Sequence, residues 1–173
     1  MKILIFFSIL IVSSFHLNAQ VDPEFPKEFI MHLKLHNGMS TNFKSTAPDL
    51  YIGGLQLVPQ YTIIAKHLRV GIIVDGFYTG KKIQGAFGPT VSLKLKTLAA
   101  KPFGSAGNIN LSLDHLWGTE KQHLFGGAIN ADIGNIIVLG ISLHRDYNLN
   151  NWWLQQSVGF RISKVKKIQE EFN

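Results

Sequence analysis

Three consecutive segments decide the fold: HLFGGAINADIG (123–134), NIIVLGISLHRDY (135–147) and NWWLQQSVGFRIS (151–163). Apolar and polar residues alternate along them, and the side chains of a β-strand point alternately to its two faces. In the last segment one face carries Trp152, Leu154, Gln156, Val158, Phe160 and Ile162. The other face carries Trp153, Gln155, Ser157, Gly159, Arg161 and Ser163. We therefore expect antiparallel strands with one apolar face and one polar face of mostly small residues.

The same alternation continues upstream and raises the number of expected strands to eight. The five earlier segments are Glu28–Gly38, Leu50–Ile63, Leu68–Thr79, Ile83–Leu98 and Asn108–Gly118. Each is long enough to cross a bilayer as a tilted strand, which takes about 9–11 residues. Pro59 and Pro89 cannot donate to a ladder, so we expect bulges or strand ends there. Eight antiparallel strands can close into an up-and-down barrel without exposed edges.

The N-terminal residues have the pattern of a secretory signal peptide. Lys2 precedes the apolar run Ile3–Val12, and we expect cleavage after Ala19. The expected organisation is a signal peptide (1–19), a leader (20–27), an all-β barrel (28–163) and a charged tail (164–173). For the tail we expect either a frayed helix or disorder.

Composition narrows the class of protein. The chain has 173 residues, 46% of them hydrophobic, a formal charge of +6 and no cysteine. An exported protein without disulfides relies on packing or on hydrogen-bonded closure. Later stretches are too short or too polar for a membrane-spanning helix, so any insertion must use strands. The charges are scattered, so we expect no nucleic-acid partner, whereas anionic lipid headgroups are compatible with them.

Aromatic residues gather at the strand ends of the outward, apolar register. One end collects Tyr51, Tyr78, Phe87, Trp117, Phe125, Tyr147 and Trp152, and the other collects Phe29, Tyr61 and Phe160. Rings around a waist of Val, Ile and Leu are typical of the two aromatic girdles of a membrane barrel. A soluble core would scatter its rings along the buried face. This pattern favours a transmembrane barrel.

The inward register is polar and carries both signs of charge. Its predicted polar network consists of Arg69, Asp75, Lys94, Asp114, Asp132 and Arg161. In a narrow lumen such groups would pair and fill the space, so we expect a plugged interior. The alternative is a soluble periplasmic lipid-binding barrel, in which these residues would form the solvated outer face.

Signal peptide, eight alternating strands, girdles and absent cysteines together resemble the small eight-stranded outer-membrane β-barrel proteins of Gram-negative bacteria. The resemblance is architectural and covers about residues 28–163. It implies a location in the outer membrane, contact with outer-membrane lipid and lipopolysaccharide, and insertion by the barrel-assembly machinery. That machinery reads a final strand ending on an aromatic residue, and SVGFRIS (157–163) matches this in part. The long connection 99–107 departs from the short periplasmic turns of the family.

The resemblance implies a structural, surface-binding or envelope-maintenance role, carried by the loops 39–49, 80–82, 119–123 and 146–151, and we expect a monomer. Some barrels of the family are lipid-modifying enzymes that use Ser and His on one strand. Ser142 and His144 are the candidates here, with Asp114 or Asp132 to orient the imidazole. A lumen hydrogen bond is the simpler explanation of Ser-x-His.

Cofactor and metal sites are not expected from the strand pattern. His32 and His36 share one face of a strand. Four residues separate them, which is about 13 Å in an extended chain, so they cannot share an ion. The glycine pairs Gly53-Gly54 and Gly126-Gly127 lie inside strands and form no phosphate loop.

Overall fold

The computed structural model describes residues 29–43, 49–65, 67–98, 107–134 and 136–163. The predicted signal peptide, leader and C-terminal tail lie outside these residues. The described chain forms eight strands: β1 (Phe29–Thr41), β2 (Leu50–Ile64), β3 (Leu68–Thr79), β4 (Lys82–Leu98), β5 (Gly107–Gly118), β6 (His123–Ile133), β7 (Ile137–Asp146) and β8 (Asn151–Ser163).

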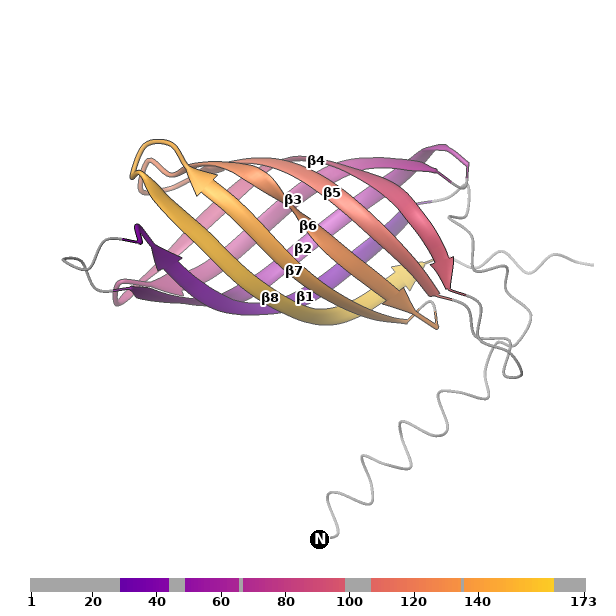
Figure 1. The fold of residues 1–173 in the computed structure, drawn as a ribbon, viewed down its shortest axis with the longest axis horizontal. Helices are drawn as coiled ribbons and strands as arrows, with labels where there is room; N and C mark the ends of the chain where they lie inside the picture. Colours follow the sequence, from indigo (N-terminus) through magenta and orange to yellow (C-terminus); the bar gives the residue numbers. More distant parts are fainter. Residues whose placement is uncertain (1–28, 44–48, 66, 99–106, 135, 164–173) are drawn as a thin grey trace, which may run out of the picture.

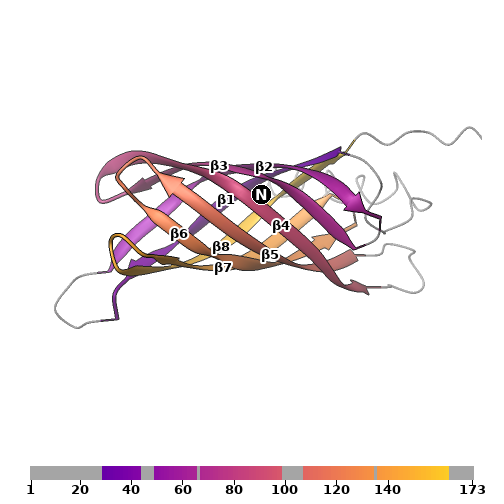
Figure 2. The same ribbon diagram turned by 90° about the horizontal axis from the view of Figure 1, so that it is seen from above.

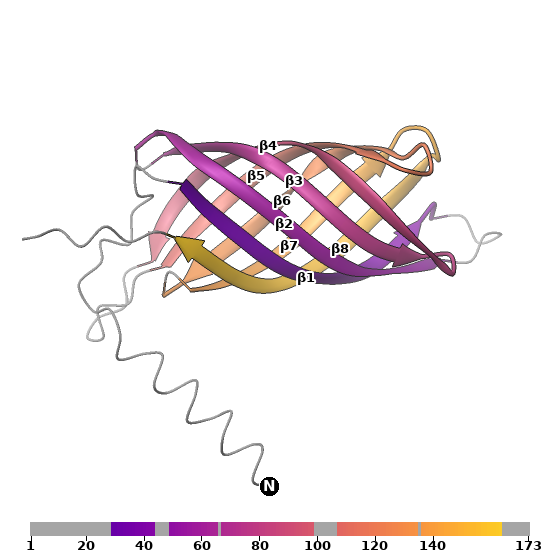
Figure 3. The ribbon, with the colours of Figure 1, turned by 180° about the vertical axis from the view of Figure 1, so that it is seen from behind.

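The strands form one closed antiparallel barrel (Figure 1). Each strand pairs with its neighbours in sequence, and β1 closes the barrel by pairing with β8. Views from above and behind show strands that wrap obliquely around a long cylinder (Figures 2 and 3). The turns β3–β4, β5–β6 and β7–β8 lie at one end of the barrel, on the left in Figure 1, and this end is called the upper end below. The start of β1 and the end of β8 lie at the opposite end. The prediction of an all-β, eight-stranded up-and-down barrel is confirmed.

The first strand is longer than predicted. β1 continues past Gly38 to Thr41, because Met39, Ser40 and Thr41 still pair with residues of β8. The expected upper loop at 39–49 is shorter by those residues. The turn between β3 and β4 is tight, with φ of 56° at Gly80 and 66° at Lys81. Two successive positive φ angles match the right-handed twist of a hairpin.

The two prolines correct a prediction. Pro59 and Pro89 mark neither bulges nor strand ends but lie within β2 and β4. Each has a partner on one side, Met31 for Pro59 and Ile72 for Pro89. On the other side the ladder skips the proline and resumes in the same register. A missing N–H interrupts that ladder without shifting it.

The register shifts lie elsewhere, between Thr62 and Ile64 and between Lys94 and Lys96. A bulge places two residues of one strand opposite one of its partner. Lys96, which alternation placed on the inward face, therefore pairs with Ile109 and is exposed.

The distribution of side chains is the reverse of that in a globular core. In the described chain thirty-five large apolar side chains are exposed, whereas ten apolar and twenty-three polar or charged side chains are buried. The described residues contain no helix that is long and apolar enough to cross a membrane.

Candidate functional site in the barrel interior

The six charged residues predicted to form a network come from β3, β4, β5, β6 and β8. Five of them are buried inside the barrel: Arg69, Asp75, Asp114, Asp132 and Arg161. Lys94 is only half-buried, just before the bulge in β4. Burial of this many ionisable groups requires partners, because an unpaired charge in a low dielectric is strongly unfavourable.

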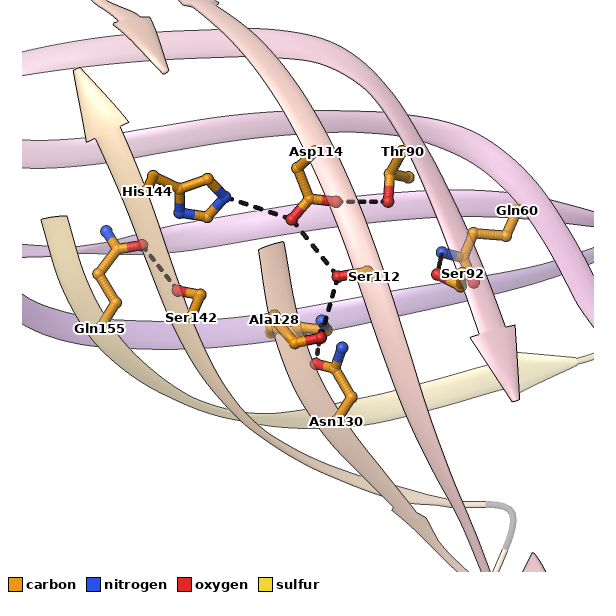
Figure 4. Close-up of polar contacts among 11 residues, drawn as sticks. Gln60, Thr90, Ser92, Ser112, Asp114, Ala128, Asn130, Ser142, His144 and Gln155 are labelled. Carbon is orange, nitrogen blue, oxygen red and sulfur yellow. Dashed lines mark hydrogen bonds and ion pairs between the residues drawn. The ribbon is translucent and has the colours of Figure 1, made fainter. Parts of the chain in front are cut away.

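Asp114 is the centre of one group of contacts (Figure 4). Its Oδ1 accepts a hydrogen bond from Thr90 Oγ1 at 2.5 Å. Its Oδ2 accepts a longer bond from Ser112 Oγ at 3.4 Å and lies 3.2 Å from Nε2 of His144. These contacts join β4, β5 and β7 across the interior. A carboxylate with both oxygens engaged is well suited to hold a neighbouring imidazole in one orientation.

A second imidazole and carboxylate form a parallel chain of contacts. His36 Nε2 lies 2.8 Å from Asp75 Oδ1. With Nε2–H donating to Asp75, Nδ1 is left to accept from the Gln155 amide, which lies 3.3 Å away. Gln155 Oε1 in turn accepts from Ser142 Oγ at 3.3 Å (Figure 4). The chain links β1, β3, β7 and β8.

Two of the buried basic groups face an acceptor within the interior. Arg69 Nη1 lies 3.7 Å from Asp132 Oδ2, and both side chains are 1% exposed. Lys34 Nζ donates to Asn130 Oδ1 at 2.9 Å. The buried cations are Lys34, Arg69 and Arg161, and the carboxylates that balance them are Asp75, Asp114 and Asp132. With neutral histidines these six charges sum to zero. A fourth buried carboxylate, Asp146 at the β7–β8 turn, accepts hydrogen bonds from the backbone N–H groups of His123, Asn148 and Leu149.

The polar side chains leave little free space. A cavity of about 30 Å³ lies among them, lined by groups such as His36, Gln60, Asp114, Asn130 and His144. One buried water needs about 10–15 Å³, so this volume accommodates about two. It is too small for a lipid chain.

An apolar cluster that we did not predict extends from the polar cavity toward the upper end of the interior. We expected polar side chains mixed with small residues throughout. Instead, the cluster consists of Ile52, Val58, Ile73, Phe77, Ala86, Leu116, Leu124 and Trp153. Phe77 and Trp153 meet edge to face, with centroids 5.1 Å apart and planes at 86°. Alternation carried to the ends of β3 and β5 gives Phe77 and Leu116 inward positions, so the signal was present.

The hydroxyl and the imidazole of the two catalytic candidates have separate hydrogen-bond partners. Ser142 and His144 are both turned into the barrel, but the hydroxyl of Ser142 donates to Gln155 rather than to the imidazole. Asp114 does contact His144, as one of the two proposed orienting carboxylates. Asp132 is engaged with Arg69 instead. The Gln155 amide that accepts from the Ser142 hydroxyl is not a base, so this contact does not activate the serine.

The predicted girdle residues lie on the outside of the barrel. Tyr51, Tyr78, Trp117 and Tyr147 are exposed by 42–63% of their surface. Trp152 is half-buried, with the guanidinium carbon of Arg145 5.1 Å from its ring centroid.

Two histidines, which we did not single out, join the aromatic residues at the upper rim. His115 of β5 and His123 of β6 have their Nε2 atoms 2.5 Å apart. The centroid of the Trp117 ring is 4.5 Å from that of His115. Their outward parity was readable, but their contact depends on the register between β5 and β6. In comparisons with known proteins, no family model and no curated relative matches this chain.

Proposed function

We propose that the chain is an integral outer-membrane β-barrel with a structural or surface-binding role and a closed interior. One observation carries the proposal: thirty-five large apolar side chains are exposed on a barrel that buries only ten apolar ones. A water-soluble monomer rarely exposes a contiguous apolar patch larger than a few hundred Å². A bilayer is the solvent that makes such a surface favourable, because lipid tails meet the apolar wall.

The length of the strands supports this reading. The shortest strand, β7, has ten residues. At about 3.3 Å per residue and a tilt of about 40° it rises about 25 Å, the height of the apolar band of outer-membrane barrels. Exposed Leu139, Ile141 and Leu143 occupy its outward positions.

The ends of the wall support it too. Exposed aromatic side chains lie near both rims, with Tyr51, Tyr78 and Trp117 at the upper end and Phe29 and Phe160 at the other. Tyr and Trp favour the headgroup region, since their rings are apolar and their N–H or O–H groups are polar.

A filled lumen is the second part of the proposal. The polar network leaves a cavity of about 30 Å³, and the apolar cluster extends from Val58 and Ile73 at that cavity to Phe77 and Trp153 nearer the upper end. Both features argue against a water-filled channel. The same small volume argues against a soluble lipid carrier, which needs an apolar cavity of several hundred Å³.

Fractionation tests the proposal. The full chain, expressed with its N-terminal residues in a Gram-negative host, should remain with the outer membrane after carbonate washing. Unheated samples should migrate differently from boiled samples, because a closed barrel resists detergent. Release into the soluble fraction would overturn the membrane assignment and favour the soluble barrel.

A further inference from the structure

We propose that His115 and His123 form a binding site for a divalent late transition-metal ion on the outer surface of the upper rim. The two imidazoles present their Nε2 atoms to each other at 2.5 Å. The inference does not depend on the membrane location, because it rests on the β5–β6 hairpin and on Tyr147 of the β7–β8 turn beside it.

The geometry suits two-point ligation. His115 pairs with Phe125 across the ladder and His123 with Trp117, so the two histidines are diagonal neighbours on one face. Metal–nitrogen bonds of about 2.0–2.1 Å at angles of about 90–109° require nitrogen atoms about 2.9–3.4 Å apart. Small rotations of the two side chains that move the Nε2 atoms apart by less than about 1 Å provide that separation. Two neutral imidazoles share only one proton at this contact. When the donating ring carries its proton on Nδ1 instead, both Nε2 atoms are free to bind one ion.

Both histidines lie on strands, and neighbouring aromatic rings hold their imidazoles in place. Trp117 lies 4.5 Å from the ring of His115 and is nearly parallel to that of His123, at 12° and 6.4 Å. The ring of Phe125 meets His115 edge on, and Tyr147 lies 6.3 Å from His123. The backbone of His123 is fixed by a bond from the N–H of Tyr147 to its carbonyl at 2.9 Å. Ligands placed on strands are positioned more tightly than ligands on loops.

The site is open to the outside. Both histidines are half-buried. Within the described chain no three His, Asp or Glu side chains are grouped as a metal site, so water or an external ligand must complete the coordination shell. Imidazole nitrogen suits Cu²⁺, Ni²⁺ and Zn²⁺, and affinity rises toward Cu²⁺ in the Irving–Williams order. Hard ions such as Ca²⁺ and Mg²⁺ prefer oxygen and should not bind.

The fluorescence of Trp117 reports whether the metal ion binds. Tag-free protein in detergent micelles is titrated with Cu²⁺, a paramagnetic ion that quenches nearby indoles. Saturable quenching at one ion per chain is expected, with no effect of Mg²⁺. His115→Gln and His123→Gln should each abolish the saturable phase. His67→Gln, which removes an exposed histidine at the opposite end of the barrel, is the matched control and should leave it intact.

A second measurement needs no variant. Modification of histidines by diethyl pyrocarbonate, followed by mass spectrometry, should show His115 and His123 protected by Cu²⁺ or Zn²⁺ and His67 unprotected. Electron paramagnetic resonance of the Cu²⁺ complex should show coordination by two nitrogens. Quenching that survives in the His115→Gln/His123→Gln double variant, or equal protection of all three histidines, would overturn the site.

Discussion

Arg69 and Asp132 face each other across the lumen, from β3 and β6, with Nη1 and Oδ2 3.7 Å apart and both side chains 1% exposed. These strands are not neighbours in the barrel wall, so the contact spans the interior. On the surface, Lys82 and Glu120 have the same separation of 3.7 Å but are 68% and 53% exposed. The two pairs differ in burial far more than in distance.

This contrast gives the first prediction. Asp132→Ala should lower the free energy of unfolding by about 3–5 kcal/mol, because it leaves the buried guanidinium of Arg69 without its carboxylate. Glu120→Ala should cost about 0–1 kcal/mol, since water and salt screen an exposed pair. Urea unfolding in vesicles, followed by heat-modifiable mobility, measures both. Equal losses in the two variants would show that the interior is solvated.

The second prediction concerns closure of the lumen. Asp114→Ala removes the group that Thr90, Ser112 and His144 contact, so the unfolding midpoint should fall. No conducting path should open, because the apolar cluster around Phe77 and Trp153 is untouched. Planar-bilayer recording checks this for the parent and the variant. Steady, ion-selective conductance in the parent would make the interior a channel.

The third prediction tests which solvent the outer wall meets. Leu139 lies mid-strand and 43% exposed, whereas Ile83 lies near the upper rim and 87% exposed. In a bilayer Leu139→Arg should cost about 2–4 kcal/mol and Ile83→Arg about 0–1 kcal/mol, since the cost of arginine depends on depth. Folding into liposomes measures both. If both sites faced water, arginine would cost little at Leu139 and at Ile83 alike. Equal and small losses of folding free energy in the two variants would therefore contradict a membrane location.

Leu111→Arg is a second mid-strand variant and should behave as Leu139→Arg does. Gly140, next to Leu139, faces inward, where an added Cβ would come within 2.6 Å of Asn130 Oδ1 and 2.7 Å of Ser157 Oγ. Gly140→Arg should therefore prevent folding, in detergent as well as in lipid, because the arginine side chain does not fit in the interior. A deficit for Gly140→Arg that appears only in lipid would mean that the faces are reversed.

The fourth prediction compares two adjacent tryptophans. Trp153 is 3% exposed and packs on Phe77, whereas Trp152 lies outside beneath Arg145. Trp153→Ala should lower the free energy of unfolding by about 3–5 kcal/mol, the usual loss for a large core side chain. Trp152→Ala removes a contact worth about 0.5–1 kcal/mol. Denaturant titration of both variants measures the two losses in unfolding free energy. Losses of equal size would mean that neither ring lies in a packed core.

The strands and their two faces were predictable because a period of two in the sequence is itself the geometry of a strand. Alternation placed Trp153 inward and Trp152 outward, as they are found. The partners across the lumen were not predictable. Alternation assigns Arg69 and Asp132 to the inside, but it does not give the relative height of strands that are not adjacent, and that height decides which charges meet.

Local exceptions to alternation were also out of reach. The bulge at Lys94–Lys96 turned Lys96 outward, and no residue pattern announced it. The prolines at 59 and 89 suggested irregularity in the wrong places, because the barrel accepts a missing N–H on one side of each strand. The His115–His123 contact depends on the β5–β6 register, and a shift by one residue would have separated the rings.

The pairing of β1 with β8, called the seam below, determines when the barrel can close. Its twelve residue pairs join positions that are from 111 residues (Thr41 to Trp152) to 133 residues (Ile30 to Ser163) apart in the chain. The first strand made is thus the one whose second neighbour is made last, and until then its open edge can pair with any other chain. Truncation before β8 would leave an open sheet with two unpaired edges, so assembly is all or nothing at this seam.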